Sequence, residues 1–141
     1  MDTIVFHVHP DEELPGARRV VPVVDGVPLT ASVTDFEVEH GCDDPAGGYD
    51  GIAVDAARAA EHARDLTTTS WWRRSRRVDL LGCECGGTAC WPLEARVHVG
   101  EHAVTWDRFR QPHRPSRDYS GFGPFAFDAA SYREAVRALE G

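Results

Sequence analysis

The sequence lacks any apolar run long enough to span a membrane. A transmembrane helix needs about 20 consecutive apolar residues, whereas the apolar stretch at the N-terminus comprises only Ile4 to Phe6. Asp2 stands where a signal peptide would carry positive charge. Membrane insertion and secretion are therefore not expected, and we predict a cytoplasmic location.

An excess of basic residues is also lacking, because 15 Lys and Arg face 23 Asp and Glu, which gives a formal net charge of −8. Phosphates and anionic lipid headgroups repel such a protein, so nucleic acid and membranes are unlikely partners. The segment 70–77, SWWRRSRR, has the aromatic and Arg content of a patch that binds single-stranded nucleic acid. On an acidic protein, however, such arginines more often pair with its own carboxylates. A protein partner, a basic one above all, or a small ligand is expected.

Internal repeats, low-complexity tracts and a linker long enough to separate two folding units are lacking as well. The 141 residues match the size of one ordinary domain. We therefore predict a single domain that spans residues 1–141.

Alternating apolar residues and turn signals predict several strands. In Thr3–His9 every second residue is apolar, which indicates a strand with one buried face. Residues 18–33 have the form of a short hairpin at a sheet edge, built on Asp25-Gly26, a pair that favours a type I′ turn. Residues 91–109 form a second predicted hairpin with Gly100-Glu101 as its turn. That turn pairs residues whose numbers sum to 201.

Helical periodicity occurs in two segments. Residues 53–66 carry an Ala-rich apolar stripe opposite a charged face. The second helix starts with Asp128 as N-cap, and Phe127 precedes it in position to pack on Tyr132. We therefore predict an α+β fold: a single antiparallel sheet of hairpins with two main helices packed on it.

A cysteine-rich loop is the most unusual feature of the sequence, because Cys83, Cys85 and Cys90 fall within eight residues beside several glycines. Three thiolates can fill three of the four positions around a tetrahedral zinc ion. Extending the hairpin register past its strands places His113 at the same end as Cys90, so His113 is the predicted fourth ligand. His40 and Cys42, from an earlier loop, are alternatives for that position.

Two other interpretations of the cysteines stay open. Free cysteines are among the most buried residue types, so the three could simply fill a Gly-rich turn. Cys90 could instead be a nucleophile with His113 as its base and Asp118 orienting the imidazole, or the two could hold a hydrolytic metal. Either arrangement would define a small hydrolase or thiol enzyme.

The segment Gln111–Phe127 is long for a loop and rich in Pro, Gly and aromatic residues. Long ordered loops are often functional, although the aromatic residues could equally plug one end of the core. We predict a binding surface formed by Arg114, Arg117 and Tyr119, next to the cysteine loop.

The motifs GCECGGTACWPL, PHR and RDYSGFGPFAF, read together over Leu80 to Leu139, resemble those of a family of small bacterial proteins without an assigned function. The resemblance implies that these segments belong to one structural unit, and it implies no activity or cofactor. The function predicted from the sequence is a binding or interaction module with a cysteine-rich loop that holds a structural zinc ion in the metal-binding interpretation. A small hydrolase or thiol enzyme that uses Cys90 and His113 is the alternative.

Overall fold

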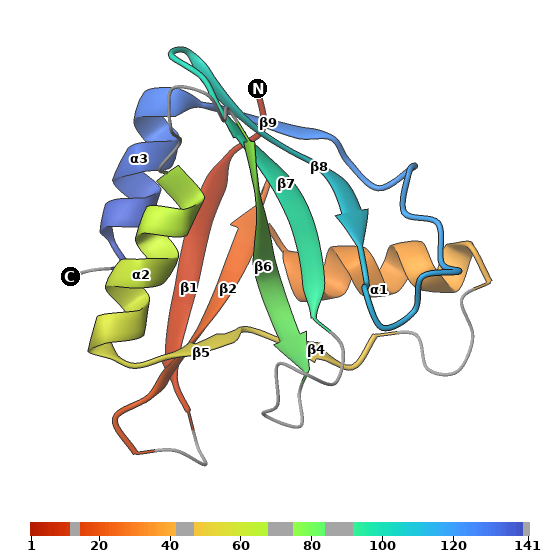
Figure 1. Ribbon diagram of the computed structural model, residues 1–141, viewed down its shortest axis with the longest axis horizontal. Coiled ribbons are helices and arrows are strands. Elements are labelled where there is room, and N and C mark those ends of the chain that lie inside the picture. The colour runs from red at the N-terminus through yellow and green to blue at the C-terminus, as the bar shows by residue number, and fades with distance from the viewer. Residues whose placement is uncertain (12–14, 42–46, 68–74, 84–91, 140–141) are drawn as a thin grey trace.

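The computed structural model describes residues 1–11, 15–41, 47–67, 75–83 and 92–139 (Figure 1). Three helices lie within these residues: α1 (Leu29–Glu39), α2 (Ala56–Thr67) and α3 (Ala129–Arg137). The strands are β1 (Ile4–Pro10), β2 (Arg18–Val24), β3 (Val27–Pro28), β4 (Tyr49–Asp50), β5 (Ile52–Val54), β6 (Ser75–Cys83), β7 (Leu93–Val99), β8 (Ala103–Arg110) and β9 (Phe125–Asp128).

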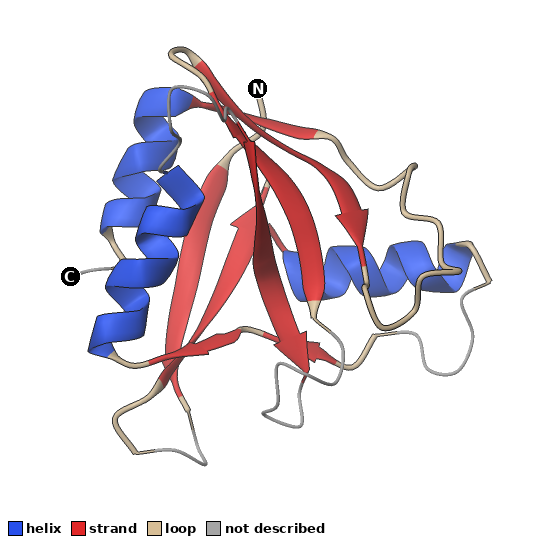
Figure 2. Ribbon diagram, in the orientation of Figure 1, coloured by secondary structure: helices blue, strands red, loops and turns tan. Residues whose placement is uncertain are grey.

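The strands form two antiparallel sheets. One has the order β1-β2-β3, with β5 also paired to β2, and the other has the order β4-β6-β7-β8-β9 (Figure 2). The sheets meet where the Asp2 backbone N–H donates to the Ala126 carbonyl, 2.7 Å away. The predicted α+β class is confirmed, but the described residues form two sheets and three helices rather than one sheet and two helices.

Helices α2 and α3 lie side by side on one side of the strands, and α1 lies on the opposite side of the molecule (Figure 1). One continuous cluster of buried apolar residues fills the space between these elements. At its centre the Trp106 indole N–H donates to the Tyr132 hydroxyl over 3.2 Å, and that hydroxyl donates to the Leu66 carbonyl over 2.8 Å. These bonds join β8, α3 and α2. No helix in the described ranges is long and apolar enough to cross a membrane.

The turn predicted at Asp25-Gly26 is confirmed, since both residues have positive φ, 53° and 80°, as a type I′ turn requires. The expected hairpin nevertheless ends early, because the second strand stops at Pro28 and Leu29 begins α1. Pro22 pairs with β1 on one side only. On its other side, β3 contacts β2 only at residues 23–24 and β5 only at residues 18–20. The proline therefore lies in a gap where no ladder bond is required.

The register predicted for the second hairpin is wrong by two residues. Val97 pairs with Trp106 rather than Val104, and Val99 pairs with Val104. The φ angle of Gly100 is not positive, whereas a two-residue turn at Gly100-Glu101 with glycine first requires a positive φ there. The Gly100 N–H donates to the Ala103 carbonyl over 2.9 Å. The turn is consequently centred one residue later than expected. Between Arg96 and the turn this even shift keeps each side chain on its predicted face, because strand side chains alternate with period two. A bulge between Glu94 and Arg96 then changes the offset, and Glu94 pairs with Arg110.

The helix starts agree in part with prediction. Asp128 is the N-cap of α3 and accepts from the Ser131 N–H over 3.0 Å, and Phe127 stacks on Tyr132 with ring centroids 5.7 Å apart. Helix α2 begins only at Ala56, since residues 52–54 belong to β5. Its buried residues are Ala59, His62, Ala63 and Leu66, so the buried face includes a histidine as well as two alanines.

Candidate functional site

The predicted cysteine site falls largely outside the described residues. Cys85, Cys90 and the alternative ligand Cys42 are outside the described residues. Cys83 is the last residue of β6. Among the described residues, no three His, Cys, Asp or Glu side chains are grouped to hold a metal ion. The proposed zinc set of Cys83, Cys85, Cys90 and His113 therefore stays a prediction.

The strand order puts Cys83 and His113 at the same end of the sheet. Strands β6, β7 and β8 are antiparallel neighbours, so the last residues of β6, the first residues of β7 and the last residues of β8 lie at the same end of the sheet. Glu94 pairs with Arg110, which puts Gln111 level with Leu93 rather than with Cys90 as expected. His113 follows two residues later, exposed at a turn.

The segment after β8 folds as a chain of tight turns. Backbone N–H groups of Arg114, Arg117 and Phe122 each donate to the carbonyl three residues earlier, over 2.9, 3.1 and 2.9 Å. Its aromatic residues turn inward: Tyr119 and Phe122 are buried, and both rings pack on Phe36 of α1. The loop therefore contributes to the core and also presents polar residues at the surface.

A completely buried carboxylate, Glu37 of α1, anchors this loop. Its side chain is 0% exposed. Oε2 accepts from the hydroxyls of Tyr49 and Tyr119, over 2.6 and 2.5 Å, and from the Arg117 guanidinium over 3.2 Å. Oε1 accepts from the Gly47 N–H over 2.7 Å. A buried carboxylate is tolerated only when charge and hydrogen bonds compensate it, and here four donors do so.

The two tyrosines remain protonated donors over the whole neutral range. Burial raises the pKa of Tyr49, and its hydrogen bond to Glu37 raises it further. The pKa of Tyr119 is raised by the same two causes. Both phenols therefore keep the proton that each donates to Glu37.

Gln111 extends this network and carries its one unsatisfied atom. It is 2% exposed, and Nε2 donates to the Tyr49 hydroxyl oxygen over 3.0 Å. That oxygen must accept, because the Tyr49 proton is already donated to Glu37. The amide orientation is thereby set, and Oε1 is left without a donor among the described residues.

A surface hollow of about 670 Å³ lies over the network. It is lined by His40, Gly41, His113, Arg114, Pro115, Ser116, Arg117 and Asp118. The His40 ring stacks on Phe36, with centroids 3.9 Å apart, and its Nδ1 lies 2.9 Å from the Phe36 carbonyl oxygen. The hollow thus brings together His113, Arg114, Arg117 and Asp118 with His40, the residue that follows α1 and that the sequence offered as an alternative ligand.

Two predicted residues have roles other than those expected. Tyr119 is buried against Glu37 and does not line the hollow. The Asp118 carboxylate accepts from the Ser120 backbone N–H over 2.9 Å. That bond lowers the pKa of Asp118, and the nearby His40 lowers it further. The hypothesis that Asp118 orients His113 beside a Cys90 nucleophile stays a prediction, because Cys90 lies outside the described residues.

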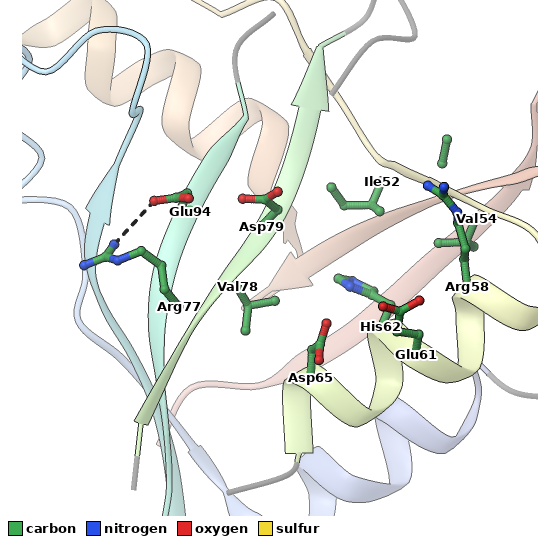
Figure 3. A pocket seen from close by; sticks show the side chains of 11 residues that line it. Ile52, Val54, Arg58, Glu61, His62, Asp65, Arg77, Val78, Asp79 and Glu94 are labelled. Atoms are coloured by element: carbon green, nitrogen blue, oxygen red, sulfur yellow. Dashed lines mark ion pairs between the residues drawn. The ribbon is translucent and has the colours of Figure 1, made fainter. Parts of the chain in front are cut away.

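A second cavity, of about 560 Å³, lies between α2 and strands β5, β6 and β7 (Figure 3). Its walls carry charged side chains from α2, β6 and β7, and the sequence analysis did not select it. The lining residues are Ile52, Ala53, Val54, Arg58, Glu61, His62, Asp65, Arg77, Val78, Asp79 and Glu94.

Two carboxylates face each other across neighbouring strands in this second cavity. Asp79 of β6 pairs with Glu94 of β7 in the backbone register. Burial raises the pKa of Asp79, and the Glu94 carboxylate raises it further. Glu94 accepts from Arg110 Nε over 2.5 Å and lies 3.8 Å from Arg77 (Figure 3).

Comparisons with protein-family models, with curated protein sequences and with solved structures find no match to this chain. Its function must therefore be inferred from the geometry of these two sites.

Proposed function

We propose that the protein is a binding module whose recognition surface is the hollow formed by His40, Gly41 and residues 113–118, here called the 113–118 surface. The observation that carries this proposal is the wholly buried Glu37 carboxylate, which holds Arg117 and Tyr119 from beneath the loop. A partner that binds a loop already held in one conformation does not have to supply the ordering entropy.

The cost of this anchor supports a function for the loop. Burying a carboxylate with an Arg partner is seldom more stabilising than packing apolar residues of the same size. Here the charged pair fixes the direction of a 14-residue connection between β8 and β9, residues 111–124. A need to hold the loop in one conformation explains this buried charge better than a gain in stability does.

The partner class that the surface suits is another protein. Exposed polar side chains, including those of His113, Ser116 and Asp118, surround the hollow, and Pro112 and Pro115 stiffen its rim. Mixed polar side chains on a rigid frame are typical of interface rims. In the proposal the cysteine loop adds to this surface, since its first residue, Cys83, pairs with Tyr49 of the network.

The experiment begins with affinity capture of partners and continues with purified components. A captured partner is mixed with ¹⁵N-labelled protein, and the amide signals that shift are mapped. Shifts are expected at His40, His113, Arg114 and residues 116–118, since Pro115 has no N–H. The double variant His113→Ala, Ser116→Ala should weaken binding at least about tenfold, about 1.4 kcal/mol.

The matched control is Glu101→Gln, at an exposed residue in the β7–β8 turn. It should leave affinity for the partner unchanged. A partner whose signal changes lie on another face, or whose affinity the double variant does not alter, would contradict the proposed surface.

A further inference from the structure

The cavity between α2 and β5–β7 shares no lining residue with the 113–118 surface, so it calls for a separate explanation. Its volume of about 560 Å³ lies within the usual range for small-molecule sites, about 300 to 1,000 Å³. Charged groups line it from α2, β6 and β7, while Ile52, Val54 and Val78 supply an apolar part of the wall.

The carboxylates of this cavity differ in how they are neutralised. Asp65 is bonded to Arg76 over 2.7 Å, and Glu94 to Arg110 over 2.5 Å. Asp79 is exposed and makes no ion pair within the described ranges, and its carboxyl group is hydrogen-bonded to that of Glu94, the residue directly opposite. Like charges that face each other across strands are destabilising. A cation at Asp79 would remove that repulsion.

His62 is a second, independent sign of a ligand. Its side chain projects from α2 into the cavity (Figure 3) and is only 8% exposed. It makes no hydrogen bond or ion pair with any described residue. Burial lowers the pKa of His62 despite the nearby Asp65 carboxylate, so at neutral pH the ring is uncharged. One of its nitrogens is then a free acceptor.

We propose that this cavity binds an organic cation that carries a primary ammonium group, with Asp79 as the anionic acceptor and His62 as a neutral one. An ammonium group offers three N–H donors, so it can satisfy more than one acceptor. The apolar wall formed by Ile52, Val54 and Val78 suits the methylene chain of such a ligand. The net charge of −8 raises the local concentration of cations around the whole protein.

An organic cation fits better than a metal ion. A divalent metal needs several oxygen or nitrogen ligands that converge on one point, and no such group of three exists among the described residues. The ammonium could belong to a free amine or to the lysine side chain of a protein. The chemistry at Asp79 and His62 is the same in both cases.

Binding is measured on the full-length ¹⁵N-labelled protein by NMR titration at low ionic strength, where exposed charges are least screened. The probes are 1,4-diaminobutane and N-acetyl-lysine methylamide, with 1,4-butanediol as the uncharged control. Both amines are expected to bind saturably, with signal changes at Ile52, His62, Val78 and Asp79, and the diol is not.

Three variants are titrated alongside the wild type. Asp79→Asn should weaken amine binding at least about tenfold, and His62→Phe, which keeps the ring and removes the acceptor, should weaken it about three- to tenfold. Glu101→Gln removes one exposed carboxylate in the β7–β8 turn and should leave the affinity unchanged. Circular dichroism confirms that each variant is folded before its affinity is compared.

Higher affinity for the diamine identifies a free amine as the ligand class. Higher affinity for the lysine derivative identifies a lysine side chain of a protein. Three results would overturn the proposal: no saturable binding of either amine, equal binding of the diol, or the same loss of affinity for Glu101→Gln as for Asp79→Asn. Because the 113–118 surface plays no part in these titrations, their failure leaves the proposed function untouched.

Discussion

The Tyr119 hydroxyl donates to Glu37 Oε2 over 2.5 Å, across 82 residues of sequence. The same oxygen accepts from Tyr49, which also receives a hydrogen bond from Gln111. One carboxylate on α1 therefore sets the position of β4 and of the segment that follows β8. The shape of the 113–118 surface depends on this long-range contact.

Replacing Glu37 by Gln should destabilise the protein by about 3 kcal/mol, because the change removes the buried carboxylate charge that accepts from the Arg117 guanidinium and from the two tyrosine hydroxyls. The Arg117 side chain is 9% exposed, so water offers little compensation. Urea unfolding measures the change in free energy, with Glu39→Gln as the matched control at an exposed position of the same helix. Equal effects from the two variants would show that the network contributes no more than a surface charge.

Gln111→Met should change the free energy of unfolding by less than about 1 kcal/mol. The substitution removes one hydrogen bond to Tyr49, but it also removes the buried Oε1, which has no donor among the described residues. Losing an unsatisfied acceptor offsets losing a satisfied donor. Chemical denaturation measures this difference, and a loss above about 2 kcal/mol would mean that Oε1 has a partner in solution.

Asp79→Asn should stabilise the protein at neutral pH. Burial and Glu94 raise the pKa of Asp79 above 3.8 in the folded state, so the folded protein binds this proton more tightly than the unfolded chain. The charged form is therefore destabilising above the raised pKa, and the penalty disappears as the pH falls through the raised pKa toward 3.8.

Thermal denaturation of wild type and Asp79→Asn between about pH 4 and pH 8 checks this sign. The difference in Tm should be largest at the upper end and shrink toward the lower end. A difference that grows on acidification would mean that Asp79 is stabilised as a carboxylate, and the interpretation of the Asp79–Glu94 pair would be wrong.

The zinc hypothesis predicts one bound ion in native mass spectrometry, lost on treatment with a chelator. His113→Ala should lower the affinity for zinc, because it removes one of the four ligands. Arg114→Ala is the control at the neighbouring residue. The bare chain mass under gentle conditions would contradict the hypothesis. Unchanged zinc in His113→Ala, with loss of zinc in Cys42→Ala, would instead identify the alternative ligand.

Local signals in the sequence were sufficient for several elements. The Asp25-Gly26 turn, the alternation in β1 and the Asp128 cap of α3 depend only on neighbouring residues, and all three are confirmed. His113, Arg114, Arg117 and Asp118 were also predicted for the site, because they are close together in one loop, whereas Tyr119 of the same loop was wrongly expected at the surface.

Features that depend on contacts between distant residues could not be predicted from the sequence, or the sequence pattern was ambiguous. Leu29, Val33 and Phe36 have helical spacing, yet the preceding hairpin turn favoured a strand, so α1 and its buried Glu37 were not predicted. An amphipathic strand pattern has period two and therefore cannot distinguish registers that differ by two residues. Neither His62 nor Asp79 belongs to a sequence motif, and only the fold places them beside one cavity.

The most direct test of the central claim is the map of amide signals that shift when a purified protein partner binds the ¹⁵N-labelled chain. The largest changes are expected at His40 and at the non-proline residues of 113–118, and they should be lost in the His113→Ala, Ser116→Ala variant. Changes centred on α3 or on the exposed edge of β1, with the loop signals unmoved, would contradict it.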